Sequence, residues 1–164
     1  MTNTQSRGFT LTEILIVIVI VGILSTLAIP SYRNYVMRTN RTVAKVALQE
    51  LVTKQESYAV DHKVYAADFA RLGIAGSGAA SVAYVGSDGA ISRNAAGALY
   101  QLALSNTTGT VSSCSSTGTA TDYAFTLTAT RLSDATDTVC GNLCISSGGV
   151  RGASLGTATD CWKR

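Results

Sequence analysis

Near its N-terminus the chain reads Arg7-Gly8-Phe9-Thr10-Leu11-Thr12-Glu13, and no charged residue follows from Ile14 to Tyr32. Nearly every position of that run is Ile, Val, Leu, Ala or Gly. In a helix that rises about 1.5 Å per residue, roughly 20 apolar residues span the hydrocarbon core of a bilayer. The sequence therefore predicts a membrane-spanning helix with one carboxylate, that of Glu13, near its N-terminal end.

This N-terminal region resembles the class III leader and first helix of type IV pilins. The matching residues are the stretch 7–13, then Gly22, Ala28-Ile29-Pro30 and Tyr32. In that family a short polar leader ends in Gly and is followed by Phe-Thr-Leu-Ile-Glu. Here Thr12 replaces the common Ile and leaves Gly8, Phe9 and Glu13 in register. The resemblance implies cleavage between Gly8 and Phe9 by a prepilin peptidase and methylation of the new Phe9 amine.

Glu13 has two interpretations. Its carboxylate could reach the lipid headgroups, since a charge at the centre of a membrane helix costs on the order of 2.5–3.5 kcal/mol and less near an end. Alternatively it pairs with an amine during assembly, either that of its own Phe9 or that of a neighbouring subunit. The presence of the whole motif favours assembly.

A removable secretory signal is the alternative to a retained helix. No small-x-small cleavage pattern follows a short apolar region, and the run is too long for a typical signal core.

The distribution of Lys and Arg around the helix bears on its orientation in the membrane. Arg33, Arg38 and Arg41 on the C-terminal side outnumber Arg7 on the N-terminal side, which by itself would place the C-terminal part in the cytoplasm. The cysteines and the pilin resemblance favour a periplasmic domain, and we follow them.

Four cysteines, Cys114, Cys140, Cys144 and Cys161, lie in the C-terminal third. An even number in a Ser/Thr/Gly-rich region downstream of a membrane anchor favours disulfides in an oxidising compartment. A metal site is less favoured, because His62 is the only histidine and the spacings form no paired Cys-x-x-Cys units. Four cysteines allow three connectivities, and spacing does not choose among them.

Two residues, Gly22 and Pro30, would loosen the first helix. Pro30 either ends it at the membrane surface or lies in a longer helix that is kinked or locally melted between Gly22 and Pro30, as the resemblance suggests. We favour the longer helix because helical periodicity resumes at once. From residue 31 to about 60 an apolar stripe recurs at three- and four-residue steps, formed by Val36, Val43, Ala44, Ala47, Leu48, Leu51, Val52, Tyr58 and Ala59.

Short strands are predicted beyond the helix, which residues 61–63 interrupt. Residues 64–72 suggest a short helical turn, and 82–85 a strand followed by the turn Ser87-Asp88-Gly89. Residues 98–105, 123–131 and 143–146 also suggest strands, the second with its Thr residues on the outer face. A helix followed by antiparallel strands predicts an α+β layer in which one small sheet packs on the helix stripe.

The C-terminal third resembles the tail of PilE-like pilins, including minor pilins. The residues that support this are the strand at 123–130, Asp137, Cys140-Gly141-x-Leu143, Gly149 and Cys161-Trp162. In that family two cysteines bridge a C-terminal loop onto the sheet, and by position these are Cys140 and Cys161. Cys114 and Cys144 are additional, and their pairing with each other is the simplest completion.

Charge gives little support for a nucleic-acid partner. Residues 61–164 contain seven basic and seven acidic side chains, and the excess lies in residues 33–60, with five basic against two acidic. A basic strip would still help a DNA-binding competence pilin, and Arg131, Arg151, Lys163 and Arg164 could form one. No catalytic constellation, cofactor motif or metal site is apparent, so we expect no enzyme.

The predicted protein is thus a type IV pilin, of the minor class, with a type IV pilin fold. Its expected parts are a leader (1–8), a transmembrane and assembly helix (9–30), an amphipathic half-helix (31–60) and a periplasmic globular domain (61–164). Expected partners are other pilin subunits in a homo- or hetero-oligomeric filament, prepilin peptidase, the pilus assembly machinery and the inner membrane before assembly. After assembly we expect a cell-surface pilus. A type II secretion pseudopilin, a DNA-binding competence pilin and an anchored enzyme are the alternatives.

Overall fold

The computed structural model describes residues 9–107, 114, 121, 124–132 and 137–163. It divides into two units, Met1–Arg38 and Thr39–Arg164. The helix α1 (Leu11–His62) contributes residues to both, and each unit is described by itself. The leader, with Gly8, lies outside the described residues.

In the first unit, α1 is helical throughout and includes both Gly22 and Pro30. The helix therefore does not end at Pro30, and the expectation of one longer helix is confirmed. Proline has no backbone N–H, so the carbonyl of Thr26, four residues earlier, has no amide donor there. Melting between Gly22 and Pro30 stays a prediction about the assembled filament.

The apolar side chains of the first unit are exposed along the helix, from Leu11 (80%) to Leu27 (72%). The hydroxyls of Ser25 and Ser31 donate to the carbonyls one turn earlier, those of Val21 and Leu27, so these polar groups are satisfied inside an apolar run. By length and composition α1 could cross a membrane, with a mean hydropathy of 2.7 in a window of which none is buried. This half of α1 thus presents apolar surface on every side.

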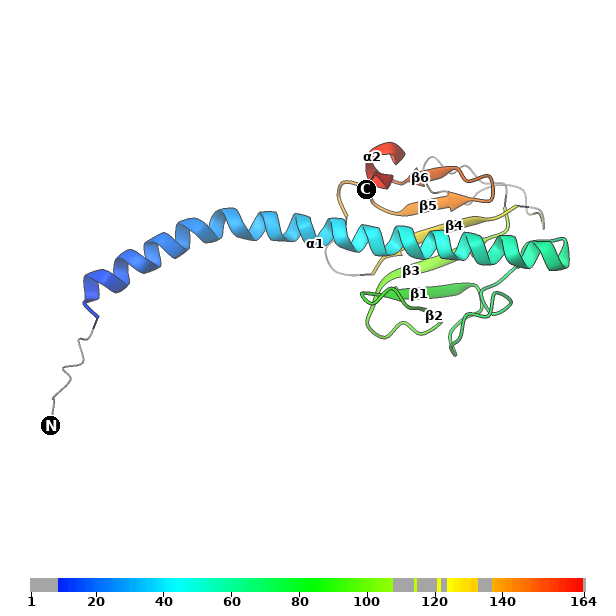
Figure 1. Cartoon of the computed structure of the whole chain (residues 1–164), viewed down its shortest axis with the longest axis horizontal. Helices are drawn as coiled ribbons and strands as arrows, with labels where there is room; N and C mark the ends of the chain where they lie inside the picture. Colours follow the sequence, from blue (N-terminus) through cyan, green and yellow to red (C-terminus); the bar gives the residue numbers. More distant parts are fainter. Residues whose placement is uncertain (1–8, 108–113, 115–120, 122–123, 133–136, 164) are drawn as a thin grey trace. The chain divides into compact units, whose positions relative to one another are not determined.

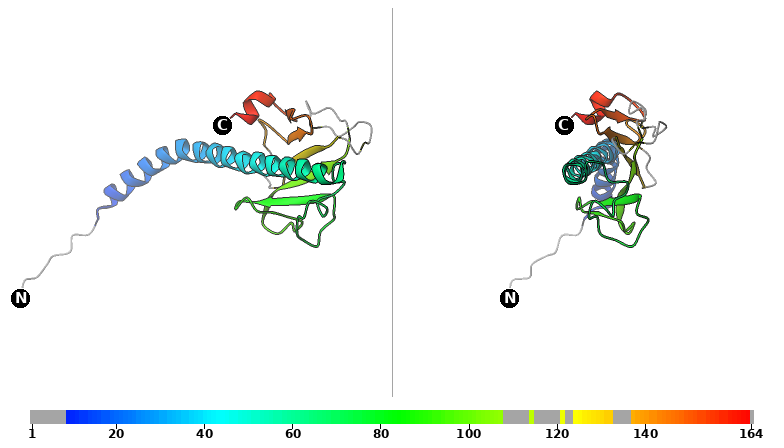
Figure 2. Two further views of the ribbon diagram at one scale, coloured as in Figure 1. Left: turned by 45° about the vertical axis from the view of Figure 1, so that its right-hand side comes forward. Right: turned by 90° about the vertical axis from the view of Figure 1, so that its right-hand side faces the viewer.

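In the second unit a six-stranded antiparallel sheet has the order β2-β1-β3-β4-β5-β6. Residues of α1 beyond Thr39 cover one face of it (Figure 1; Figure 2). A short helix, α2 (Ala158–Trp162), follows the last strand. The strands are β1 (Val82–Gly86), β2 (Ile91–Ser92), β3 (Ala98–Ser105), β4 (Thr126–Arg131), β5 (Leu143–Ser146) and β6 (Arg151–Ala153).

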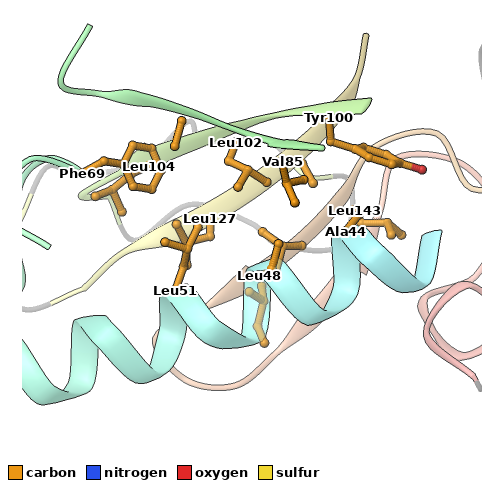
Figure 3. Close-up of a cluster of buried hydrophobic side chains, with 14 of the residues drawn as sticks. Ala44, Leu48, Leu51, Phe69, Val85, Tyr100, Leu102, Leu104, Leu127 and Leu143 are labelled. Atoms are coloured by element: carbon orange, nitrogen blue, oxygen red, sulfur yellow. The ribbon is translucent and has the colours of Figure 1, made fainter. Parts of the chain in front are cut away.

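The core lies between α1 and the sheet (Figure 3). Alternate residues of the strands point to the helix because side chains in a strand alternate between faces. Ala44, Leu48 and Leu51 of α1 pack against Leu102 of β3 and Leu127 of β4. All five side chains are fully buried. The predicted α+β layer, with the helix stripe packed on one sheet, is confirmed.

Gln55 is a polar residue on the buried stripe, and the apolar pattern did not indicate it. Its amide brackets Ala66, donating to the carbonyl (3.0 Å) and accepting from the N–H (2.9 Å). Asn106 also donates to the same carbonyl, at 3.3 Å. These bonds satisfy the backbone groups of Ala66 outside any helix. Residues 64–72 form bends and turns, so the predicted helical turn there is wrong.

The strand predicted at 123–131 is longer than β4, which begins at Thr126, and it also differs from β4 in the exposure of one threonine. Thr126, expected on a solvent-facing side, is 1% exposed. Thr128, on the same face, lies opposite Cys144, and Cys144 is bridged to Cys114. Thr128 is half-buried and Thr130 is exposed, so the predicted outer position of these threonines holds at the C-terminal end of β4 and fails at Thr126. Tyr123, the predicted first residue of the strand, lies outside the described residues.

Candidate functional site

The N-terminal end of α1 presents Phe9 and Glu13 one turn apart. Phe9 is 79% exposed, and Glu13 is also exposed. The hydroxyl of Thr10 accepts the N–H of Glu13 at 3.3 Å and lies 3.2 Å from the hydroxyl of Thr12. This is a side-chain cap for a helix start that otherwise lacks acceptors. Within the described residues Glu13 has no ion-pair partner, so its carboxylate is available to an amine.

Two disulfides hold the C-terminal loop. Cys140 is bonded to Cys161 and Cys114 to Cys144, the first as the PilE-like pattern implies and the second as the simplest completion. Cys140, Cys144 and Cys161 are buried. The first bridge ties α2 to Cys140, just before β5, and the second ties Cys114 to β5.

A buried ion pair connects this loop to α1. The guanidinium of Arg41 donates through Nε and, at 2.6 Å, through a terminal nitrogen to the two carboxylate oxygens of Asp137. The side chains are 14% and 1% exposed. The predicted stripe contains apolar residues alone and leaves out Arg41, but Arg41 lies three residues before Ala44 and so on the same face of α1.

Asp137 also caps the start of the loop, since its carboxylate accepts the N–H groups of Val139 and Cys140 at 3.0 Å. Burial alone would raise the pKa of Asp137. Hydrogen bonds from Arg41, Cys140 and Val139 outweigh burial and hold the pKa below its ordinary value. One turn along α1, Lys45 donates to the backbone carbonyl of Lys163 at 2.9 Å. Both ends of the Cys140–Cys161 loop are thus bound to α1.

An exposed basic and aromatic surface lies on α2 and β6. The indole N–H of Trp162 donates to the carbonyl of Gly152 at 2.9 Å, and the guanidinium carbon of Arg151 lies 5.2 Å from the centre of the Trp162 ring. A hollow of about 350 Å³ is lined by Arg151, Ala158, Thr159, Trp162 and Lys163. We call these five residues the Trp162 hollow.

Of the four residues proposed for a basic strip, the structure brings Arg151 and Lys163 together. Arg131 instead lies 5.9 Å from the centre of the Tyr100 ring. Arg164 lies outside the described residues. His62 stacks on Tyr58, with ring centres 3.9 Å apart, and no group of three His, Cys, Asp or Glu side chains suited to a metal ion occurs among the described residues.

Two protein-family models match this chain, one over its N-terminal segment and one over most of the remainder. A family model described as "Type IV minor pilin ComP, DNA uptake sequence receptor" matches residues 30–144, more than half of the chain. The prokaryotic N-terminal methylation motif matches residues 3–29. The chain belongs to the type IV pilin family.

Individual type IV pilins are similar over part of their length. The major pilin PilE of Neisseria gonorrhoeae is 35% identical over 83 residues, covering 51% of this chain and 50% of that protein. The major pilin PilA of Myxococcus xanthus is 41% identical over 68 residues, 42% of this chain and 30% of its own length. The wide-pilus major component PilA4 of Thermus thermophilus is 40% identical over 68 residues, 42% of this chain and 52% of its own. This pilin therefore matches about half, or less, of the length of these relatives.

Sequence reasoning on this pilin missed the residues that join α1 to the C-terminal loop. In the sequence Asp137 stands out only as part of the tail pattern, and Lys45 only as one of the five basic residues of 33–60. Their partners are far along the chain, so no local period reveals them. A single acidic residue three positions before a buried cysteine, as in Asp137 and Cys140, is the one local signal, because that spacing suits a side-chain cap.

Proposed function

We propose that this pilin is made as a prepilin, cleaved between Gly8 and Phe9, methylated at Phe9 and assembled by helix packing into a type IV pilus. Before assembly its helix lies in the inner membrane and its globular domain in the periplasm. Afterwards it is part of a cell-surface filament that serves twitching motility, adhesion or DNA uptake. Its partners are other pilins, prepilin peptidase and the assembly machinery.

The observation that supports this proposal most is the uncovered apolar half of α1. Its large side chains, from Phe9 to Ile29, are about half exposed or more. Such a helix suits lipid, because its backbone groups are satisfied internally, and it also suits a bundle of identical helices. Transfer from one environment to the other changes little apolar exposure, so polar contacts would set the register.

Glu13 is suited to set that register. It is the only charged side chain between Phe9 and Tyr32, and after cleavage the amine of Phe9 is the complementary group. Pairing across subunits staggered along the filament removes an uncompensated charge from an apolar core. A wrong register leaves both charges unpaired, which penalises misassembly.

The test compares Glu13→Ala with Thr12→Ile, which introduces the residue common in the family. We expect Glu13→Ala to be cleaved and to accumulate in membranes, while sheared filaments contain at least tenfold less of it than of wild type. Thr12→Ile should assemble normally. Glu13→Ala present in filaments at the wild-type level would contradict this role of Glu13.

A second candidate function is DNA binding, which the description of the matched family favours. The match to a minor-pilin family also favours a pilus subunit over a secretion pseudopilin. Phosphate contacts would make such binding strongly salt-dependent. The full chain in detergent micelles, titrated with duplex DNA over a salt series, tests the candidate; no binding at low salt would exclude it.

A further inference from the structure

We propose that the Trp162 hollow is the surface on which this pilin holds DNA phosphates, independently of base sequence. This inference rests on the proposed DNA-binding function. It assigns phosphate contacts to Arg151 and Lys163 and places any sequence discrimination elsewhere on the protein.

The side chains that line the hollow are held in place by the surrounding structure. Trp162 is fixed at its edge by the bond to Gly152 and on its face by Arg151, and α2 is anchored by the Cys140–Cys161 bridge. Arg151, on the exposed edge strand β6, has no acidic partner among the described residues. Its planar fork of N–H donors matches the geometry of phosphate oxygens, and the ring holds it in place before a ligand arrives.

Lys163 supplies a second positive charge, which can exchange its present partner for a phosphate. It pairs with Asp160 at 2.9 Å, but both side chains are about two-thirds exposed, and pairs of that kind contribute little and are screened by salt. A phosphate can therefore replace Asp160. Lys45 fixes the position of Lys163 through the bond to its carbonyl.

Most other cations of this unit have partners in the structure. Arg41 is bound to Asp137, and Arg93 donates to the carbonyls of Ile74 and Gly78. Lys54 and Arg71 pair with acidic residues of their own segments, Glu50 and Asp68. Lys54 and Arg71 also line a common hollow, but Asp61 lines it with them. Among the described residues no acidic side chain lines the Trp162 hollow, so Arg151 and Lys163 are the adjacent cations best placed to bind phosphate.

The geometry favours phosphates over bases as the ligand. The Trp162 edge already donates to Gly152 and one face of the ring is covered by Arg151, so a base that stacks on that face would first have to displace the guanidinium. Contacts to phosphate position a duplex and contain no sequence information. The Trp162 hollow should thus supply affinity common to all sequences.

The experiment uses the full chain in detergent micelles and two short duplexes of unrelated sequence. Fluorescence anisotropy of labelled DNA gives the affinity over a salt series, and fluorescence of Trp162, the only tryptophan, reports contact with the hollow. The variant is Arg151→Gln/Lys163→Gln, and the matched control is Lys63→Gln/Arg71→Gln, which removes two exposed charges outside the hollow. Arg151→Lys keeps the charge and shows whether a loss reflects charge or packing.

We expect DNA to change the Trp162 emission of the wild type. The double variant should lower the slope of log affinity against log salt by about 2, since each phosphate contact contributes about 0.9. Affinity should fall by the same factor for both duplexes. The control should keep the wild-type slope, and Arg151→Lys most of it.

Three different results would overturn the DNA-binding function, the role of the hollow and the phosphate assignment. Wild-type protein that binds no DNA at low salt overturns both this inference and the DNA-binding function. Wild-type binding with an unchanged slope in the double variant overturns the hollow alone. A loss that differs between the two duplexes would show base recognition at the hollow and overturn the phosphate assignment.

Discussion

Arg41 and Asp137 lie 96 residues apart in the chain and form a two-point ion pair that is almost fully buried. The same carboxylate caps the start of the disulfide loop by accepting two backbone N–H groups. One acidic side chain thus joins α1 to the Cys140–Cys161 loop. Asparagine at this position would keep Oδ1 as the acceptor of the two backbone N–H groups, but it would leave the buried guanidinium without its counter-charge and would place an NH2 group opposite Arg41 Nε.

Asp137→Asn should therefore destabilise the globular unit by about 3–5 kcal/mol, the range found when one partner of a buried ion pair is removed. Urea unfolding of the full chain in detergent, followed by the emission of Trp162, measures the loss. Asp160→Asn is the control, because Asp160 pairs with Lys163 on an exposed surface and should cause little change. A stability of Asp137→Asn equal to wild type would show that the pair is dispensable.

The pH dependence of stability should include a contribution from Asp137. Its pKa is lowered in the folded protein, so the unfolded chain takes up a proton first as the pH falls. The stabilisation is present above the ordinary carboxyl pKa of about 4 and is lost as the pH falls below it through the folded pKa. Wild type should lose stability in this window more steeply than Asp137→Asn, and parallel curves would refute the assignment.

Gln55→Leu tests the bracket on Ala66. Asn106 still donates to the Ala66 carbonyl, so the substitution leaves mainly the Ala66 N–H unsatisfied, at a cost of about 1–3 kcal/mol. Gln49→Leu, at an exposed position of the same helix, is the control and should be near neutral. The urea midpoints of the two variants give the comparison, and equal midpoints would mean that Gln55 contributes only volume.

Removal of the Cys140–Cys161 bridge by Cys140→Ser/Cys161→Ser should cost about 3 kcal/mol, because the closed loop spans 21 residues. It should also release α2, and with it Trp162, from the sheet. Thermal unfolding measures the first effect and Trp162 emission in the native state the second. An unchanged melting temperature with unchanged emission would show that the bond between Trp162 and Gly152 holds α2 unaided.

Regular periods in the sequence located the elements that pack on a single face. The bounds predicted for 98–105 and 143–146 coincide with β3 and β5, because alternating residues there face one core. The prediction failed for Thr126, which is 1% exposed, whereas Thr130 on the same face of β4 is exposed as predicted. Two-residue β2 and three-residue β6 are too short to show a period.

The candidate site could be predicted only in part, because a local sequence pattern does not show where distant segments of the chain meet. The N-terminal motif is local and contiguous, so the family could be predicted from residues 7–32. The contacts of Arg41 and Lys45 with the C-terminal loop, and the packing of Arg151 on Trp162, depend on where distant segments meet. Charge pattern alone placed Arg131 with Arg151, whereas Arg131 lies on the Tyr100 ring.

The central claim is that this chain is processed and assembled as a pilin, and intact mass with N-terminal sequencing of the protein from its native membranes and filaments tests it most directly. We predict a mature chain that begins at N-methylated Phe9 and has a mass lower by four hydrogens than the reduced form, corresponding to two disulfides. An unprocessed leader with free thiols would contradict the account and would indicate a cytoplasm-facing domain on a membrane anchor.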